Sequence, residues 1–131
     1  MTSHEVLIVE DERLIALDLQ EMCEELGHRV LALAATASEA RELLERLSPS
    51  LILSDFELRG DGDGVDVVAG LRRRCPRLRI VFVTAATGRA ARERIASVEP
   101  DEILAKPVSR DALRAALSIT PPRSSRKASS M

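Results

Sequence analysis

The chain has 131 residues, of which 45% are hydrophobic and 31% charged, and its formal net charge is -2. A chain of this length forms one domain that buries roughly two thirds of its unfolded surface, which excludes a second domain. It contains neither a membrane-spanning apolar stretch nor a charged leader before an apolar run, so we expect a cytoplasmic protein without a membrane partner.

Short apolar segments typical of buried strands alternate along the chain with segments of helical periodicity. The strands are expected at residues 6–9, 30–33, 51–55, 80–84 and 102–105, and the helices at 13–26, 37–48, 65–75, 89–97 and 111–117. This alternation predicts an α/β fold, a doubly wound five-stranded parallel sheet with strand order 2-1-3-4-5.

Local signals support several of the expected helix ends. Gly27 is expected to end the first helix, and Thr36 with Glu39 to form a capping box for the second. Ser109 is expected to cap the last helix. We therefore expect the folded domain to cover residues 1–119, followed by a disordered polar tail at 120–131 that is rich in Pro and Ser.

Acidic side chains follow two of the predicted strands at the point where each strand ends. Glu10 and Asp11 follow the first strand, and Asp55 ends the third. Because the carboxyl ends of parallel strands meet at one edge of a sheet, these carboxylates are expected to cluster there. Clustered carboxylates repel one another unless a cation neutralises them, and hard oxygen ligands in an open site suit Mg²⁺.

Groups that could stabilise a phosphoryl group end the two remaining strands of this edge. Thr84 and Ala85 follow the fourth strand and offer a hydroxyl and a backbone N–H, and Lys106 follows the fifth with an ammonium. Aspartate is a known nucleophile in phosphoryl transfer, which needs such neutralising groups around the phosphoryl oxygens. The constellation therefore indicates phosphoryl transfer to Asp55.

The glycine-rich turn after Asp55 is not a phosphate-binding loop of the Walker type. Gly60, Gly62 and Gly64 lack the required spacing and the following Lys-Ser/Thr pair. We interpret this segment as a flexible turn.

Four short motifs, each closing a strand, give the chain a resemblance to a known family. They are Val9-Glu10-Asp11-Glu12, Ser54-Asp55, Val83-Thr84-Ala85 and Ala105-Lys106-Pro107. From about residue 4 to residue 118 the chain resembles the receiver domain of two-component response regulators, which has a flavodoxin-like fold. The opening run through Leu26 is similar to receivers of alphaproteobacterial stand-alone regulators and stress-response regulators.

The resemblance implies roles for individual residues. Asp55 would accept a phosphoryl group from a phosphohistidine on a sensor histidine kinase or a histidine phosphotransfer protein. Asp11, Asp55 and the backbone carbonyl of Glu57 would bind Mg²⁺ directly, and Glu10 would hold a metal-bound water. Lys106 would contact the phosphoryl group, and the peptide before Pro107 is usually cis. Such a domain is not an enzyme in the usual sense, because it catalyses only its own phosphorylation and dephosphorylation.

The resemblance also implies an output surface built from the helix at 89–97, the strand at 102–105 and the helix at 111–117. If the fold is as expected, five arginines line it: Arg89, Arg92, Arg94, Arg110 and Arg114. We expect a downstream protein target there, in a regulator without an output domain of its own, and leave homodimerisation open. Basic runs without a recognition helix or aromatic stacking platform argue against direct binding of nucleic acid.

Several positions depart from the family's usual pattern, and the pair Asp63-Gly64 is displaced by one residue relative to it. Ile103 stands where an aromatic commonly precedes the lysine, so an aliphatic side chain must transmit the switch. Arg59 replaces the usual proline of the turn after Asp55. Glu57 adds a negative charge near the path of hydrolytic water, which we expect to alter the lifetime of the acyl phosphate.

Two alternative functions stay open on sequence grounds. One is a receiver that signals by binding alone, although Asp11, Asp55, Thr84 and Lys106 argue against a lost phosphorylation site. The other is a Mg²⁺-dependent phosphohydrolase with an aspartyl nucleophile, in which Glu57 would imitate the second acid. Cys23 and Cys75 are interpreted as free thiols with no metal or catalytic role.

Overall fold

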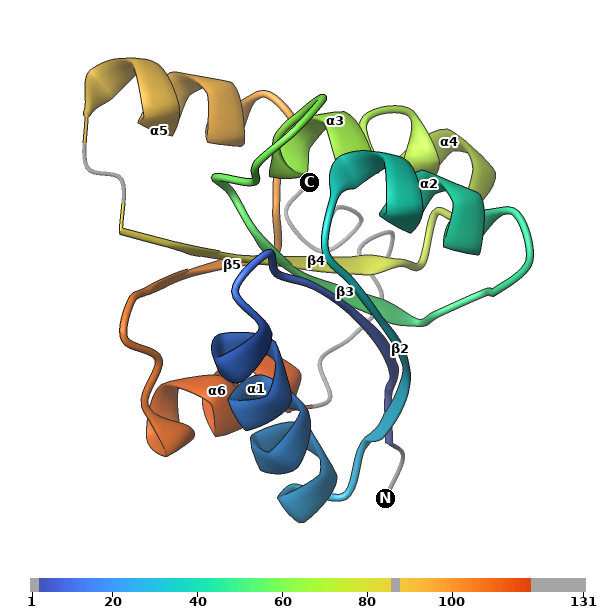
Figure 1. Ribbon diagram of the computed structural model, residues 1–131, viewed down its shortest axis with the longest axis vertical. Helices are drawn as coiled ribbons and strands as arrows, with labels where there is room; N and C mark the ends of the chain where they lie inside the picture. Colours follow the sequence, from blue (N-terminus) through green and yellow to red (C-terminus); the bar gives the residue numbers. More distant parts are fainter. Residues whose placement is uncertain (1–2, 86–87, 119–131) are drawn as a thin grey trace, which may run out of the picture.

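Five parallel strands form one sheet in the order β2-β1-β3-β4-β5, which confirms the predicted topology (Figure 1). The computed structural model describes residues 3–85 and 88–118, so the tail predicted at 120–131 lies outside the described residues. The strands are β1 (Glu5–Val9), β2 (Arg29–Ala34), β3 (Leu51–Asp55), β4 (Arg79–Thr84) and β5 (Glu102–Ala105).

The predicted helices are present, and the third is divided into two pieces. The helices are α1 (Arg13–Glu25), α2 (Ala37–Leu44), α3 (Gly64–Val68), α4 (Leu71–Arg74), α5 (Arg89–Ala96) and α6 (Arg110–Leu117). The expectation of one continuous helix over 65–75 is wrong, because Ala69 is extended and Gly70 adopts a left-handed conformation at φ 81°. Glycine accepts this conformation readily and is a poor helix former, so the chain turns there and buries Leu71 again in α4.

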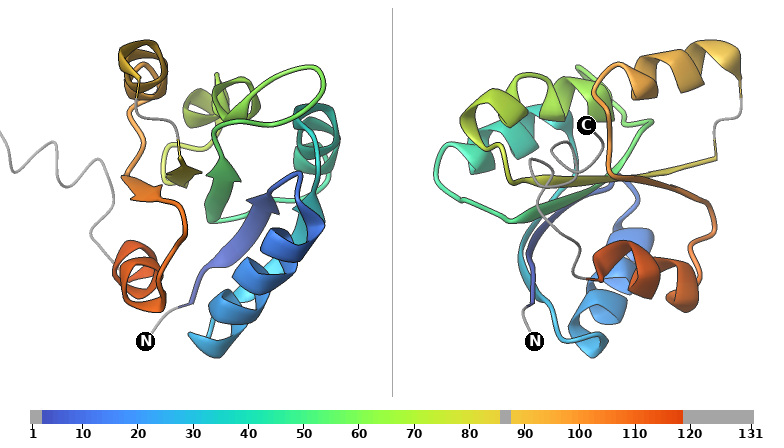
Figure 2. Two further views of the ribbon diagram at one scale, coloured as in Figure 1. Left: turned by 60° about the vertical axis from the view of Figure 1, so that its left-hand side comes forward. Right: turned by 180° about the vertical axis from the view of Figure 1, so that it is seen from behind.

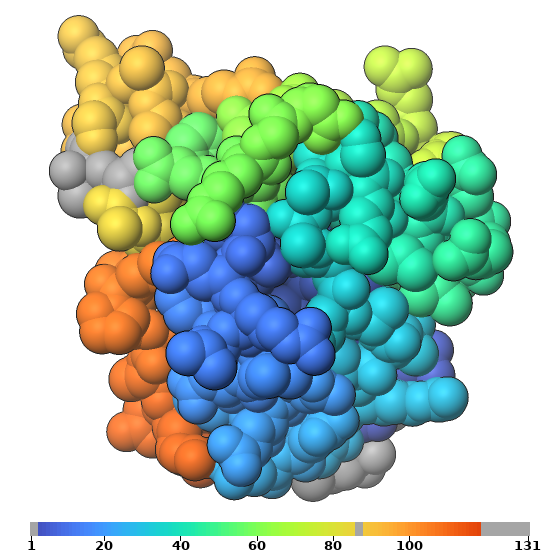
Figure 3. All heavy atoms as spheres, in the orientation of Figure 1, coloured from blue at the N-terminus to red at the C-terminus, as the bar shows by residue number. Residues whose placement is uncertain are grey.

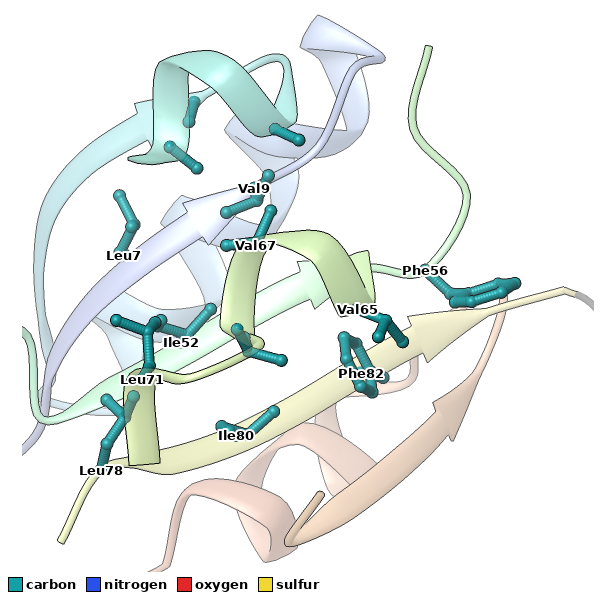
Figure 4. Packing of buried hydrophobic residues seen from close by; sticks show 14 of the residues in the cluster. Leu7, Val9, Ile52, Phe56, Val65, Val67, Leu71, Leu78, Ile80 and Phe82 are labelled. Atoms are coloured by element: carbon teal, nitrogen blue, oxygen red, sulfur yellow. The ribbon is translucent and has the colours of Figure 1, made fainter. Parts of the chain in front are cut away.

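Strand residues alternate between two apolar layers, one on each face of the sheet. Helices α2, α3, α4 and α5 cover one face. Figure 4 shows Ile52 and Phe82 among the buried strand side chains on that face. Helices α1 and α6 cover the other face, and the two layers of helices are separated by the sheet in Figure 2. Strand β3 is the central strand of the sheet and is buried along its whole length, so the position of Asp55 at its end is fixed by the core.

The helix caps agree with the predicted signals, with one difference. Ser109 accepts a hydrogen bond from the N–H of Ala112 and starts α6. Thr36 accepts one from the N–H of Glu39, but the Glu39 carboxylate binds the N–H of Ala35 instead of closing the box at Thr36. Within the described residues, no helix combines the length and the apolar character needed to cross a membrane.

Candidate functional site

The strand ends that carry the predicted site residues meet at one edge of the sheet. Val9 is paired with Ser54, which sets Glu10 and Asp55 side by side one residue further on. On the other side of β3, Asp55 is paired with Val83, and Val83 with Leu104, so Lys106 follows two residues beyond the level of Asp55 at the same edge of the sheet. The register of the parallel sheet therefore brings together side chains that are up to about a hundred residues apart in the sequence.

Asp55 lies at the centre of this edge with little access to solvent, since only 5% of the residue is exposed. Its Oδ2 atom is 2.7 Å from the Lys106 ammonium, and its Oδ1 atom accepts a hydrogen bond of 3.2 Å from the N–H of Glu57. Burial acts to lower the pKa of Lys106, but the carboxylates of Asp55 and Glu10 outweigh it and hold that pKa above its usual value. Lys106 is therefore a fixed positive charge beside the Asp55 carboxylate.

Glu10 is buried behind Asp55. Its Oε2 atom accepts a hydrogen bond of 3.1 Å from the N–H of Glu12, and its Oε1 atom lies 3.3 Å from the Lys106 ammonium. Burial raises the pKa of Glu10, and the nearby Asp55 carboxylate raises it further. Oε1 accepts no hydrogen bond from the described residues, so this buried oxygen has capacity for a further cationic or polar partner.

Asp11 is held by the turn that follows β3. Its Oδ2 atom accepts a hydrogen bond of 3.1 Å from the N–H of Arg59, and the Arg59 guanidinium lies 3.4 Å from the same oxygen. A proline at position 59 could not donate that hydrogen bond, because proline has no N–H. The departure from the family pattern at Arg59 thus supplies a contact between the turn and the acidic cluster.

Glu10, Asp11 and Asp55 form the group of carboxylates that could hold a metal ion. One oxygen from each residue lies within 4.8 Å of the other two. An all-oxygen donor set that includes a buried carboxylate oxygen without a hydrogen bond from the described residues fits a hard divalent cation such as Mg²⁺. All three residues were candidates on sequence grounds, whereas the ligand role expected of the Glu57 carbonyl stays a prediction.

The two other predicted groups lie beside this cluster. Thr84 is buried at the end of β4, and its carbonyl accepts a hydrogen bond of 3.1 Å from the N–H of Lys106. Ala85 is exposed at the same edge. The Lys106-Pro107 peptide bond is cis, as the resemblance implies.

Gly64 belongs to the site, although the sequence interpretation noted it only as part of the displaced Asp63-Gly64 pair and gave it no role there. A Cβ atom at this position would lie 2.5 Å from the carbonyl oxygen of Asp55 and 2.9 Å from the ring of Phe82. The Gly64 N–H also donates a hydrogen bond of 2.8 Å to the carbonyl of Phe56. The view of the glycine-rich turn as merely flexible is therefore wrong at Gly64, where the backbone packs directly on the segment that carries Asp55. The Asp63-Gly64 pair, a helix cap followed by a residue without Cβ, was the available signal.

Comparisons with known proteins agree with this geometry. A family model described as the response regulator receiver domain matches residues 6–118. The regulator PhyR of Methylorubrum extorquens is 40% identical over 105 residues, which cover 79% of this chain and 38% of that protein. The transcriptional regulatory protein PdtaR of Mycobacterium tuberculosis is 37% identical over 106 residues, which cover 79% of this chain and 50% of that protein. The chain thus spans half or less of the length of these curated relatives.

Solved structures of signal receiver proteins are also similar to this chain. The signal receiver domain of a modulated diguanylate cyclase from Desulfovibrio desulfuricans has a TM-score of 0.81 and 37% sequence identity, and the match covers 88% of this chain and 90% of that one. The anti-anti-sigma factor PhyR from Bartonella quintana has a TM-score of 0.72 and 34% identity, covering 88% of this chain and 46% of that one.

Proposed function

Because the chain belongs to the response-regulator receiver domain family, we propose that it is a phosphorylation-dependent switch in two-component signalling, with Asp55 as the phosphoryl acceptor. The observation that carries this proposal is the Asp55 carboxylate, buried at the sheet edge, 2.7 Å from the Lys106 ammonium and beside two further acidic residues. Receiver domains are signalling modules, and a general signalling role fits the relatives.

The proposed reaction transfers a phosphoryl group from a histidine to Asp55. A carboxylate oxygen of Asp55 forms a bond to phosphorus while the phosphorus–nitrogen bond of the phosphohistidine breaks, and the electron pair leaves on the imidazole nitrogen. Lys106 neutralises charge on the phosphoryl oxygens, and the Thr84 hydroxyl and the Ala85 N–H donate to them. The product is an acyl phosphate on Asp55.

In this proposal, Asp11, Asp55 and the carbonyl of Glu57 hold Mg²⁺, and Glu10 holds a water of the ion. A bound Mg²⁺ supplies further neutralisation of charge on the phosphoryl oxygens. Before the reaction, the Lys106 ammonium and the Arg59 contacts keep the three carboxylates together despite their mutual repulsion.

The phosphodonor would approach beside α1. An apolar hollow of about 270 Å³ lies next to Lys106, between α1 and the segment after β5, and its lining includes Ile15, Met22 and Val108. Leu14, on the same helix, is 82% exposed. An apolar hollow and an exposed leucine on the helix that lines it suit a protein partner, which we propose to be a sensor histidine kinase or a histidine phosphotransfer protein.

The output surface is proposed to comprise α5, β5 and α6. Strand β5 pairs with β4 and is largely exposed, and 52% of Ile103 is accessible to solvent. Four of the five arginines expected to line this surface make ion pairs with acidic side chains. The pairs are Arg89 with Glu93, Arg94 with Asp63, Arg110 with Glu25 and Arg114 with Asp111. A downstream protein target, or a second copy of this chain, would contact what is left of that basic surface.

Asp55→Asn is expected to abolish phosphorylation, since an amide cannot form the acyl phosphate. The protein is incubated with Mg²⁺ and acetyl phosphate, and its intact mass is recorded for the wild type and the variant. One Mg²⁺-dependent, alkali-labile adduct in the wild type alone supports the proposal. A folded wild type that binds Mg²⁺ without an adduct would favour binding independent of phosphorylation. Repeated turnover of a phosphate ester would favour a phosphohydrolase.

Lys106→Met is expected to lower the rate of acyl phosphate formation about tenfold, the cost of one charge-assisted hydrogen bond. The same change should strengthen Mg²⁺ binding roughly threefold to tenfold, because an ammonium no longer competes for the Asp55 carboxylate. Calorimetric titration measures the affinity, since the chain has no Trp or Tyr for fluorescence. Lys106→Arg is the control that keeps the charge, and weaker Mg²⁺ binding in Lys106→Met would contradict the argument.

A further inference from the structure

Helix α5 lies beside the turn that follows Asp55. Figure 1 shows α5 at the end of the row of helices on its face of the sheet, and Figure 3 shows the turn, in green, between α5 and the start of α1. Ile95 anchors α5 in the core, and the next residue back, Arg94, faces the turn. The contacts of Arg94 therefore join this helix to the loop that begins at the acceptor.

Arg94 binds the start of α3 through three hydrogen bonds, two to Asp63 and one to Asp66, and this arrangement is called the fork below. Its Nε atom donates to Asp63 Oδ2 over 2.6 Å, and its Nη2 atom donates to Asp63 Oδ1 over 2.9 Å and to Asp66 Oδ1 over 3.1 Å. Asp63 and Asp66 also cap α3 reciprocally through their backbone N–H groups. One guanidinium thus binds both acids of the capping box. A lysine ammonium could not make these parallel hydrogen bonds from a planar group.

The residue after Asp63 is Gly64, which packs on the acceptor itself. Its missing Cβ leaves room for the carbonyl oxygen of Asp55, and its N–H binds the carbonyl of Phe56. A displacement of Asp63 along the chain must therefore move Gly64 against the backbone of Asp55. Arg94, Asp63, Gly64 and Asp55 form a continuous series of contacts from α5 to the acceptor.

The connection that the resemblance implies between the acceptor site and the output surface is altered in this chain. The resemblance implies an aromatic side chain three residues before Lys106, and this position is Ile103, which is 52% exposed on β5. An aliphatic side chain there offers no ring whose rotation could report the state of Thr84. A second physical connection between the acceptor and α5 would supplement this aliphatic side chain.

We propose that Arg94 is a positioning residue that couples α5 to the acceptor site through Asp63 and Gly64. The inference rests on the proposed function of Asp55 and adds a connection specific to this chain. With the fork intact, the turn holds Asp55 in place for Mg²⁺ and the phosphoryl group. By reciprocity, occupation of the site alters the stability of α5.

The fork is partly exposed, with 44% of the Arg94 side chain and 24% of the Asp63 side chain accessible. Ion pairs at such positions contribute little to global stability, typically below about 1 kcal/mol. Loss of the fork should therefore leave the fold intact and act mainly on the coupling between the two sites. A change in coupling without a loss of global stability distinguishes a positioning role of Arg94 from a merely structural one.

The test compares Arg94→Gln with Arg29→Gln, a matched control that removes a surface arginine paired with Glu5 at the far end of the sheet. Beryllium fluoride with Mg²⁺ serves as the phosphoryl mimic. Calorimetry gives its affinity, and amide hydrogen exchange gives the protection of α5 with and without it. We expect Arg94→Gln to weaken binding about threefold, the equivalent of a partly exposed ion pair, and to lose most of the ligand-induced change in α5.

Asp63→Asn supplies the second arm, because asparagine keeps the cap oxygen of α3 while removing one of the two charges that Arg94 binds. Once Asp63 is Asn, Arg94→Gln should weaken binding less than it does in the wild type, because only the contact with Asp66 is left to lose. Arg94→Lys should restore only part of the coupling, since lysine cannot make the fork. Equal affinity and an equal α5 response in Arg94→Gln and Arg29→Gln would overturn the inference while leaving the proposed function intact. If the wild type does not bind the mimic at all, the proposed function itself fails.

Discussion

Replacing Gly64 with alanine is expected to damage both the fold and the acceptor site. The new Cβ atom would lie 2.5 Å from the carbonyl oxygen of Asp55 and 3.2 Å from the Cα atom of Phe56, and these backbone atoms cannot rotate away. Overpacking of this kind costs about 1–3 kcal/mol of unfolding free energy. A shift of Asp55 by about 1 Å would slow acyl phosphate formation on the order of 100-fold.

Gly88→Ala is the matched control, because a Cβ atom at Gly88 meets no atom of the described residues within 4 Å. Its effect on unfolding should be about 1 kcal/mol or less, the cost of a poorer cap residue. Urea unfolding followed by circular dichroism gives the stabilities, and intact mass gives the rate of phosphorylation by acetyl phosphate. Similar stabilities and rates for the two variants would show that Gly64 does not constrain Asp55.

Asp101→Ala is expected to cause the largest loss of stability among the charged residues. The Asp101 side chain is fully buried, and its Oδ2 atom accepts hydrogen bonds from Arg72 over 3.1 Å and from the N–H of Ile80 over 2.8 Å. The guanidinium of Arg79, also buried, lies 3.9 Å from Oδ1. Removing the carboxylate takes away the charge that compensates two arginines, which costs about 3–5 kcal/mol.

Two further variants separate the contributions of Asp101. Asp101→Asn keeps an oxygen that can accept from the Ile80 N–H and should lose less stability than Asp101→Ala. Asp111→Ala removes an exposed carboxylate paired with Arg114 and should change stability by about 1 kcal/mol or less. Chemical denaturation compares the three variants. A loss for Asp101→Ala no greater than that for Asp111→Ala would contradict a role for the buried network.

The sheet and the cluster at its edge were predictable because local signals and topology agree. Each strand is short, apolar and bounded by turn residues, and alternation with helices restricts the sheet to a few strand orders. Once the order is known, the ends of β1, β3, β4 and β5 must meet. Glu10, Asp55, Thr84 and Lys106 could therefore be placed together from their positions at strand ends alone.

Contacts made by particular side chains across the fold could not be predicted in this way. The break at Gly70 depends on the conformation of one residue, and glycine within a helical pattern is also tolerated elsewhere. The burial of Asp101 and the fork of Arg94 depend on the distance between elements, which periodicity does not give. Gly64 is needed only because α3 begins against the backbone of Asp55.

The most direct test of the central claim is to identify the residue that carries the phosphoryl group. The protein is phosphorylated with acetyl phosphate and Mg²⁺, treated with sodium borohydride to reduce the acyl phosphate, and digested for peptide mass spectrometry. The proposal predicts that position 55 alone is converted to homoserine, and only when Mg²⁺ is present. Reduction at Asp11, Glu57 or another carboxylate, with Asp55 unmodified, would contradict the assignment of Asp55 as the acceptor.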